Sequence, residues 1–134
     1  MTIRAVADTH TVLWYLFDDK RLSDNARGLM DAIDAAGDQI AVSSIAFAEM
    51  IYLAEKGRID AQALDRVLAV LDQVDATLQE IPFDRAVAQA MLHIDRRQVP
   101  ELPDRIVAAT SLHLGVPAIS RDRKIQSSGI TTIW

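Results

Sequence analysis

The stretch from Ile3 to His10, Ile-Arg-Ala-Val-Ala-Asp-Thr-His, decides how this chain folds. Its first residues are almost all apolar, which is typical of a short β-strand buried on both faces of a sheet. We expect this strand to end at Asp8. A carboxylate at the end of a buried strand is costly to keep unless a partner compensates its charge. The stretch therefore predicts a buried strand and, at its carboxyl end, a candidate site.

Short apolar runs alternate with amphipathic helical patterns through most of the remaining sequence. Further strands are predicted at 39–43, 78–83, 116–120 and 130–134, and helices at 11–16, 23–36, 45–56, 60–75, 85–97 and 105–114. Ser23, Asp60 and Asp84 are the predicted N-caps, and Pro100 and Pro103 are predicted to interrupt the chain. This order predicts an α/β fold: a single domain over residues 1–134, with a mainly parallel five-stranded sheet and helices on both faces.

Length and composition limit the classes of protein that the chain can form. Its 134 residues suffice for one domain with one core, and half of them are apolar. No cysteine is present, which excludes disulfides, thiolate metal sites and cysteine nucleophiles. The first residues lead into the predicted strand rather than a signal peptide, and no apolar run approaches the roughly 20 residues that span a bilayer. We expect a cytoplasmic protein without membrane attachment.

The net charge of −5 argues against a protein that holds nucleic acid on a broad basic surface. It does not exclude an enzyme that reaches phosphates through a bound metal and a few local cations. The candidate cations are Arg105, Arg121, Arg123 and Lys124. For each of them alone, solvated surface charge is the simpler interpretation.

Four acidic residues occupy positions that this fold would bring together. Asp8 and Asp122 follow predicted strands, Asp104 opens a helical pattern, and Glu49 interrupts the apolar segment 45–54. In open parallel sheets, ligand sites lie at the carboxyl ends of strands, near the point where strand order reverses. We therefore expect the four carboxylates to face one rim of the sheet.

Each acid also has a plain structural interpretation. Asp8 can cap a turn or helix, Asp104 can complement the dipole of a first helical turn, and Asp122 can belong to a solvated loop. Glu49 is harder to explain in this way, because its apolar neighbours predict a helix buried nearly all round. Two carboxylates about 5 Å apart repel by roughly 3 kcal/mol at an effective dielectric near 20. Four converging acids would therefore destabilise the fold unless cations bind or the pKa values of the acids rise.

The sequence resembles the PIN-domain nucleases along essentially its whole length. Four segments that carry the acids appear in the family's order, at residues 6–10, 43–49, 103–110 and 120–122. The turn at 56–59 and the terminal Ile133-Trp134 make the chain most similar to VapC-like toxins of toxin–antitoxin pairs. The resemblance implies a single PIN-like domain over residues 1–134.

The resemblance further implies an endoribonuclease toxin that depends on Mg²⁺ or Mn²⁺ and cuts cellular RNA by a metal-activated water. The family's acidic quartet falls on Asp8, Glu49, Asp104 and Asp122. Asp8 and Asp104 are the expected principal metal ligands. Asp122 and Glu49 are expected to hold metal-bound waters or a second ion.

Neighbouring polar residues have less certain roles in this resemblance. Thr9 and Ser120 are expected to orient an acid or a water, with helix capping as an equal alternative. Ser120 stands where a Thr is more usual, which preserves the hydroxyl. Glu101 stands where family members often have an Asp, and its role stays open. His10 is left out of the mechanism, because a metal hydroxide does not need it as a base.

The expected partners follow from the resemblance alone. They are an RNA substrate, a cognate antitoxin that inhibits the enzyme, and a second subunit in a homodimer or a toxin–antitoxin hetero-oligomer. Trp14, Phe17 and Leu53 are candidate interface residues. Core packing is the simpler interpretation for all three.

Two other classes of function stay open at this point. A receiver-like, Mg-binding signalling domain needs an acceptor Asp after its central strand, which Asp84 could supply, and a Lys after its last strand. The last predicted strand runs to Trp134 without such a Lys. A non-enzymatic protein-binding module would use the acids only as helix caps and would bind no Mn²⁺.

Overall fold

Five parallel strands form one sheet in the computed structural model, which describes residues 2–134. The strands are β1 (Ile3–Ala7), β2 (Gln39–Ser43), β3 (Leu78–Ile81), β4 (Ala118–Ile119) and β5 (Thr132–Ile133), in the order β3-β2-β1-β4-β5. Every neighbouring pair in the sheet is parallel. The predicted α/β fold with a five-stranded, mainly parallel sheet is confirmed.

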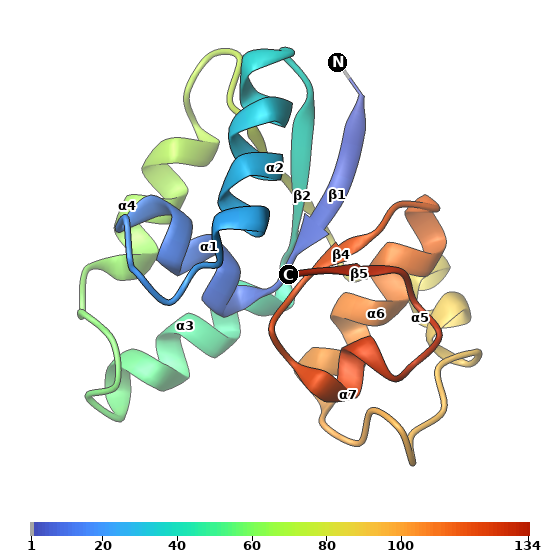
Figure 1. Cartoon of the computed structure of the whole chain (residues 1–134). Coiled ribbons are helices and arrows are strands. Elements are labelled where there is room, and N and C mark those ends of the chain that lie inside the picture. The colour runs from blue at the N-terminus through green and yellow to red at the C-terminus, as the bar shows by residue number, and fades with distance from the viewer. Residues whose placement is uncertain (1) are drawn as a thin grey trace.

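Helices cover both faces of this sheet (Figure 1). Within residues 2–134 they are α1 (Thr9–Leu16), α2 (Asp24–Ala35), α3 (Ile45–Glu55), α4 (Ala63–Leu71), α5 (Arg85–Met91), α6 (Leu102–Leu114) and α7 (Arg123–Gln126). The first four helices lie to one side of the strands and the last three to the other. None of the helices described is both long and apolar enough to cross a membrane.

Alternate residues of the central strands supply two separate hydrophobic clusters. Ala5 and Ala7 of β1 pack with side chains of α1 to α4, whereas Val6 between them packs with side chains of α5, α6 and α7. In β2, Ile40 belongs to the first cluster and Ala41 to the second. Burial on both faces explains why Ala5, Val6 and Ala7 are apolar without alternation, while Arg4 near the start of the strand is exposed.

Some predicted helix limits are wrong. The predicted helix 60–75 is reduced to Ala63–Leu71, and the predicted helix 85–97 already ends at Met91. Pro103 does not interrupt the chain but lies in the first turn of α6, where its missing N–H needs no intrahelical partner. The short helix α7 was not predicted, because the charged run around it resembles a solvated loop.

The order of the strands reverses beside β1. From β1 the chain moves outward to β2 and β3, and it then returns to the opposite side of β1 to form β4 and β5. Asp8 directly follows β1, and Ser120 directly follows β4. Because β1 and β4 are parallel neighbours, these two residues lie at the same edge of the sheet, where such folds bind ligands.

Candidate active site

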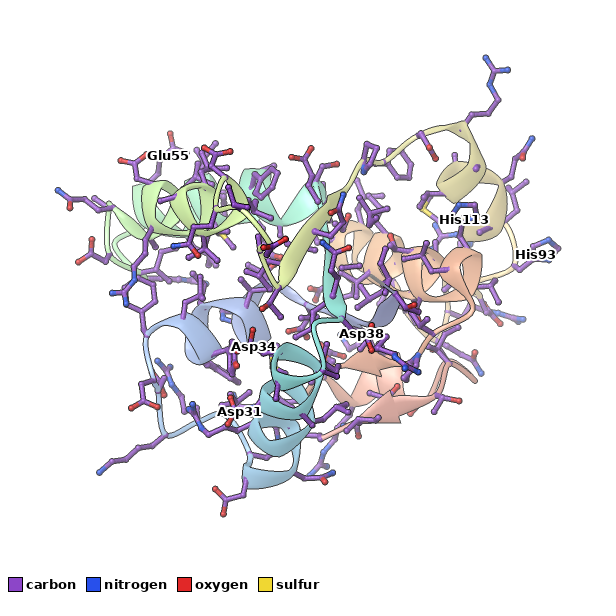
Figure 2. The ribbon with its side chains drawn as sticks, turned by 90° about the horizontal axis from the view of Figure 1, so that it is seen from above. Asp31, Asp34, Asp38, Glu55, His93 and His113 are labelled. Atoms are coloured by element: carbon purple, nitrogen blue, oxygen red, sulfur yellow. The ribbon has the colours of Figure 1, made fainter. Side chains whose placement is uncertain are left out.

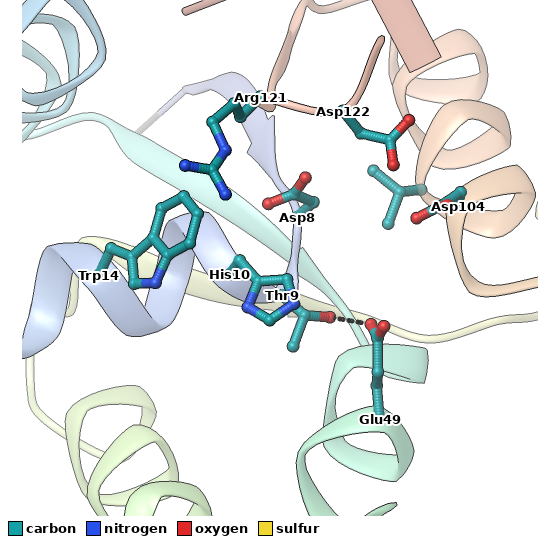
Figure 3. Close-up of a pocket in the computed structure, with 9 residues that line it drawn as sticks. Asp8, Thr9, His10, Trp14, Glu49, Asp104, Arg121 and Asp122 are labelled. Atoms are coloured by element: carbon teal, nitrogen blue, oxygen red, sulfur yellow. Dashed lines mark hydrogen bonds between the residues drawn. The ribbon is translucent and has the colours of Figure 1, made fainter. Parts of the chain in front are cut away.

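A pocket of about 140 Å³ opens at this reversal point, and all four predicted acids line it. Asp8, Glu49, Asp104 and Asp122 come from four different segments of the chain and surround one space (Figure 3). The remaining lining residues are Thr9, His10, Trp14, Val107 and Arg121. The structure thus brings the acids together at the expected rim, while their catalytic and metal-binding roles remain predictions.

Asp8 is both a helix cap and a member of the pocket. One of its carboxylate oxygens accepts a hydrogen bond from the backbone N–H of Thr11 at 2.9 Å, which caps α1. The other oxygen accepts a hydrogen bond from the hydroxyl of Ser120. With one donor on each oxygen, the plane of the carboxylate is fixed relative to the ends of β1 and β4.

Ser120 links the carboxyl ends of the neighbouring strands β1 and β4. Its side chain is fully buried, and besides donating to Asp8 its Oγ accepts from the backbone N–H of Asp122 at 3.0 Å. Asp122 in turn caps α7, since its Oδ1 accepts from the N–H groups of Lys124 at 2.8 Å and Ile125 at 3.2 Å. A single hydroxyl therefore positions two of the four acids relative to each other.

Glu49 reaches the pocket from the second turn of α3. Its Oε1 accepts a hydrogen bond from the hydroxyl of Thr9, which is itself buried (Figure 3). The prediction that this helix is buried nearly all round is wrong: Ile51 and Tyr52 are 48% and 53% exposed. The reason is that α3 lies beyond the ends of the strands rather than flat on the sheet, so only one side of it packs inward.

Asp104 is the acid whose surroundings are least favourable for a negative charge. Burial is the largest cause, and together with the nearby charges of Asp122, Glu101, Glu49 and Asp8, in that order, it raises the pKa of this carboxyl to about 7. No hydrogen bond contributes to the shift. Its place in the first turn of α6, where the helix dipole favours a negative charge, does not offset these effects.

Protein cations do not compensate the acid pocket. The ion pairs found within residues 2–134 all involve other acids, including Glu101, whose carboxylate lies 3.6 Å from the ammonium of Lys124. Arg121 lines the pocket, but its guanidinium lies over the ring of Trp14, 4.6 Å from the ring centroid. Four carboxylates therefore share one pocket without an ion pair, while five acids outside it have arginine or lysine partners.

The donor set fits a hard divalent cation. Carboxylate oxygens are the ligands that Mg²⁺ prefers, and this ion is commonly held by one or two of them with several waters. No three histidine, aspartate or glutamate side chains in the described part of the chain stand close enough together to hold a metal ion directly. The pocket therefore suits an ion that would be held by one or two of the carboxylates and would keep part of its water shell.

Other sequence candidates are placed differently from expectation. Arg105 cannot reach RNA phosphates, because its guanidinium is turned inward and donates to the carbonyls of Met91 at 3.3 Å and Ile94 at 3.2 Å. Core packing is the correct interpretation of Trp14 and Leu53, whose side chains are buried.

Outside the pocket, Phe17 is 39% exposed and is the one surface candidate among the three suggested interface residues. His93 and His113 lie on the outer surface around α5 and α6, apart from the acids of the pocket (Figure 2). Asp31 and Asp34 lie on α2, and Asp38 lies just after it.

Sequence reasoning did not find the pocket's contacts with α1 beyond Thr9. His10 stands at the edge of the pocket, and its ring lies 5.4 Å from that of Trp14. The signal available in the sequence was the four-residue spacing of these two rings, which places them on one side of a helix. Arg121, by contrast, was among the predicted candidate cations, and it does line the pocket.

The comparison with known proteins gives the class of protein that this fold and pocket define. Residues 5–129 match the model of the PIN domain family, so the chain belongs to that family. It is similar to Ribonuclease VapC22 of Mycobacterium tuberculosis, with 29% identity over 120 residues that make up 90% of this chain and 88% of that protein.

Solved structures share the fold at lower sequence identity. A VapBC2 complex of Rickettsia felis bound to a promoter DNA fragment aligns with a TM-score of 0.68 and 15% identity over 97% of both chains. A DNA-bound VapBC of Salmonella typhimurium has a TM-score of 0.67 and 20% identity over 98% of this chain and 97% of that one. A toxin–antitoxin complex of Klebsiella pneumoniae has a TM-score of 0.66 and 23% identity over 97% and 96%.

Proposed function

We propose that this protein is a Mg²⁺- or Mn²⁺-dependent endoribonuclease that serves as the toxin of a toxin–antitoxin pair. One observation carries the proposal: four carboxylates line one pocket at the reversal point of a parallel sheet without a protein cation to pair them. Membership of the PIN domain family and the similarity to Ribonuclease VapC22 support the choice of RNA as substrate.

In the proposed mechanism, Asp8 and Asp104 would hold the divalent cation, and Asp122 and Glu49 would position the water that it activates. When bound, the cation would polarise the phosphodiester and make a water more acidic. Ser120 and Thr9 hold Asp8 and Glu49 in place through their hydroxyl hydrogen bonds. Attack of water on phosphorus breaks the bond to the 3′ oxygen, which takes up a proton and leaves a 5′-phosphate on the other fragment.

The raised pKa of Asp104 is consistent with this role. A carboxyl with a pKa of about 7 in the cation-free protein is destabilised as an anion by burial and by its acidic neighbours. A divalent cation held by Asp8 and Asp104 would weaken both effects, because its positive charge would offset the lost hydration and the repulsion between the acids. The same geometry that is unfavourable in isolation is therefore favourable for holding a cation.

The proposed toxin role brings the expected partners with it. A cognate antitoxin would inhibit cleavage by covering the acid pocket, and the active assembly would be a homodimer or a toxin–antitoxin hetero-oligomer. The fold likeness to chains in VapBC and other toxin–antitoxin complexes supports this part of the proposal.

The two rival functions fit the structure less well. In a receiver-like domain, the acceptor Asp84 would follow the central strand, but here it follows the edge strand β3 and caps α5, accepting from Val87 N–H at 3.0 Å. A module that uses its acids only as caps would explain Asp8 and Asp122, which do cap helices. It would not explain Glu49, which lies inside α3 and accepts a hydrogen bond from the hydroxyl of Thr9.

The proposal is tested by incubating purified wild-type protein with total cellular RNA in Mg²⁺, in Mn²⁺ and in a chelator, and by sequencing the new RNA ends. We expect new 5′-phosphate ends with either metal and none in the chelator. Asp8→Asn should produce none under any condition, while Asp38→Asn, which removes a paired acid outside the pocket, should cleave like wild type. Cleavage by Asp8→Asn at the wild-type rate would contradict the mechanism.

A further inference from the structure

A second pocket adjoins the acid pocket and has no role in the chemistry described so far. It has a volume of about 230 Å³ and shares His10 and Trp14 with the acid pocket. The other residues that line it are Leu13, Phe17, Asp19, Arg21, Arg58, Ile59, Asp60 and Ala63. Because two residues belong to both pockets, an extended ligand that crosses the acids can continue into this second space.

Aromatic rings border the second pocket at its surface. His10 is exposed, and its ring is tilted by 30° to that of Trp14 (Figure 3). Phe17 is 39% exposed, and the guanidinium of Arg66 lies 4.6 Å from its ring centroid. Partly exposed rings beside a cationic surface are the features on which proteins stack the bases of single-stranded nucleic acids.

The second pocket is lined by equal numbers of acidic and basic side chains. Arg21 forms an ion pair with Asp19 at 2.7 Å, and Arg58 and Asp60 have opposite charges, so the formal charges of the lining cancel. A neutral, partly aromatic space suits a base better than a phosphate.

Two exposed arginines can instead take the phosphates. In the structure over residues 2–134, neither Arg58 nor Arg121 forms an ion pair, and each lines one of the two adjoining pockets. Both residues are exposed, so their guanidinium groups can donate charge-assisted hydrogen bonds to phosphate oxygens. Their positions fit the phosphates on either side of a nucleotide whose base enters the second pocket.

We propose that the second pocket is a base pocket: it receives the base of a nucleotide next to the cleaved phosphate in single-stranded RNA. His10 and Phe17 stack on the base, and Arg121 and Arg58 contact the flanking phosphates. The inference rests on the proposed ribonuclease function, since it assigns part of that enzyme's substrate. A base held in a duplex cannot enter, so the enzyme selects unpaired RNA. An apolar protein segment would not need the two unpaired arginines.

The test uses single-stranded RNA oligonucleotides of about ten nucleotides that contain one site cut by the wild-type protein. A second set replaces the nucleotides on either side of the cut, one at a time, with abasic ribose. Dissociation constants are measured with the full chain made cleavage-deficient by Asp104→Asn, and kcat and KM are measured without that substitution. The same sequence closed into a hairpin stem provides the paired substrate.

We expect His10→Ala and Phe17→Ala to weaken binding of the intact oligonucleotide by roughly tenfold each and to raise KM, as loss of a stacked ring does elsewhere. His10→Phe should restore binding, because it keeps a ring without a titratable nitrogen. Arg58→Gln should weaken binding and reduce its salt dependence. Arg4→Gln, at the opposite edge of the sheet, is the control that removes the same charge and should change neither.

The abasic oligonucleotide identifies the group that is recognised. At the position whose base enters the pocket, wild type should bind it about tenfold more weakly, and Phe17→Ala should add no further loss. Unchanged affinity and KM in both ring variants and in Arg58→Gln would overturn the base pocket and assign the surface to a protein segment. Arg58 is exposed and unpaired among the residues described, so Arg58→Gln tests the proposal even if a ring variant does not fold.

The two proposals fail in different ways. A wild-type protein that cuts no RNA, but whose RNA affinity depends on His10 and Phe17, would contradict the ribonuclease and keep the base pocket. A wild-type protein that cuts RNA, with variants that have the same KM and dissociation constant, would contradict only the base pocket.

Discussion

The acids of the pocket and the arginine-paired acids of the surface have opposite surroundings. Asp38 lies 2.9 Å from the guanidinium of Arg4, and Asp19 lies 2.7 Å from that of Arg21. Hydrogen bonds from these arginines lower the pKa of Asp38 and lower that of Asp19 to about 2. Burial and neighbouring acids instead raise the pKa of Asp104 to about 7. These two surface acids have arginine partners, whereas none of the four pocket acids takes part in an ion pair within residues 2–134.

The sharpest way to break this comparison is to remove one acid from each group and measure RNA cleavage. We expect Asp8→Asn and Asp104→Asn to lower the cleavage rate by at least about 100-fold, because each removes a proposed metal ligand from a shared site. Asp38→Asn, which breaks an exposed pair, should stay within about twofold of wild type. The rates are measured on one RNA at saturating Mn²⁺.

Equal loss of activity in all three variants would show that negative charge in general, rather than the pocket, matters for cleavage. Thermal unfolding of each variant in chelator is the necessary companion measurement. It separates a lost ligand from a lost fold, since a folded variant with no activity has lost chemistry alone.

A smaller effect is expected from the hydroxyl groups that hold the acids. Ser120→Ala removes the donor to Asp8 and the acceptor for the backbone of Asp122, so we expect cleavage to fall by about tenfold or more. The matched control is Thr77→Ala, which removes a hydroxyl that donates to Asp34 away from the pocket. Both variants are compared by kcat and by the Mn²⁺ concentration for half-maximal rate.

Ser120 would have a purely structural role if Ser120→Ala lost stability but kept both kinetic values. If Ser120 positions the acids, Ser120→Ala should need more Mn²⁺ to reach its half-maximal rate but should still unfold cooperatively. Thr77→Ala should leave the Mn²⁺ requirement unchanged whatever it does to stability.

Sequence patterns were sufficient for the fold, because burial on both faces of a parallel sheet leaves a direct mark on the chain. The apolar run 3–7 and the spacing of Leu64, Val67 and Leu71 determine where strands and helices occur. Helix ends were less predictable, since they depend on local hydrogen bonds. Asp122 shows this well: its carboxylate caps a four-residue helix that no periodicity of that length could reveal.

The acids were predictable in position but not in surroundings. Glu49 was expected to be buried by an apolar helix, yet Ile51 and Tyr52 are exposed because α3 lies beyond the strand ends. The inward turn of Arg105 towards two carbonyl groups also depends on tertiary packing that sequence spacing does not encode. Contacts between distant segments, such as Ser120 with Asp8, become visible only once the topology is known.

Stability in the absence of metal sharpens the same comparison. In chelator at pH 8, we expect Asp104→Asn to stabilise the protein by about 1–2 kcal/mol, a value reduced for solvent screening because the carboxyl is only half-buried. The variant gains stability because a neutral Asn side chain does not bury a charge and is not repelled by the other acids. Asp38→Asn should destabilise the protein, because it removes a favourable pair. Urea unfolding of the three proteins gives both signs in one experiment.

The dependence of that gain on pH is the finest test. The pKa of Asp104 lies above its unfolded value of 3.8, so between about pH 4 and 7 the folded protein keeps a proton that the unfolded chain has lost. Wild-type stability should therefore fall as pH rises through this window and level off above about pH 7. The advantage of Asp104→Asn should be small at pH 5 and complete at pH 8.

Asp38 provides the control for this pH dependence because its pKa is shifted in the opposite direction. A lowered pKa gives stability that is present above 3.8 and is lost only below it, so the effect of Asp38→Asn should be constant between pH 5 and 8. An advantage of Asp104→Asn that is equally constant would mean that Asp104 is already ionised at pH 5. The ionised acids of the pocket would then not destabilise the folded protein, and the contrast between paired and unpaired acids would no longer indicate a cation site.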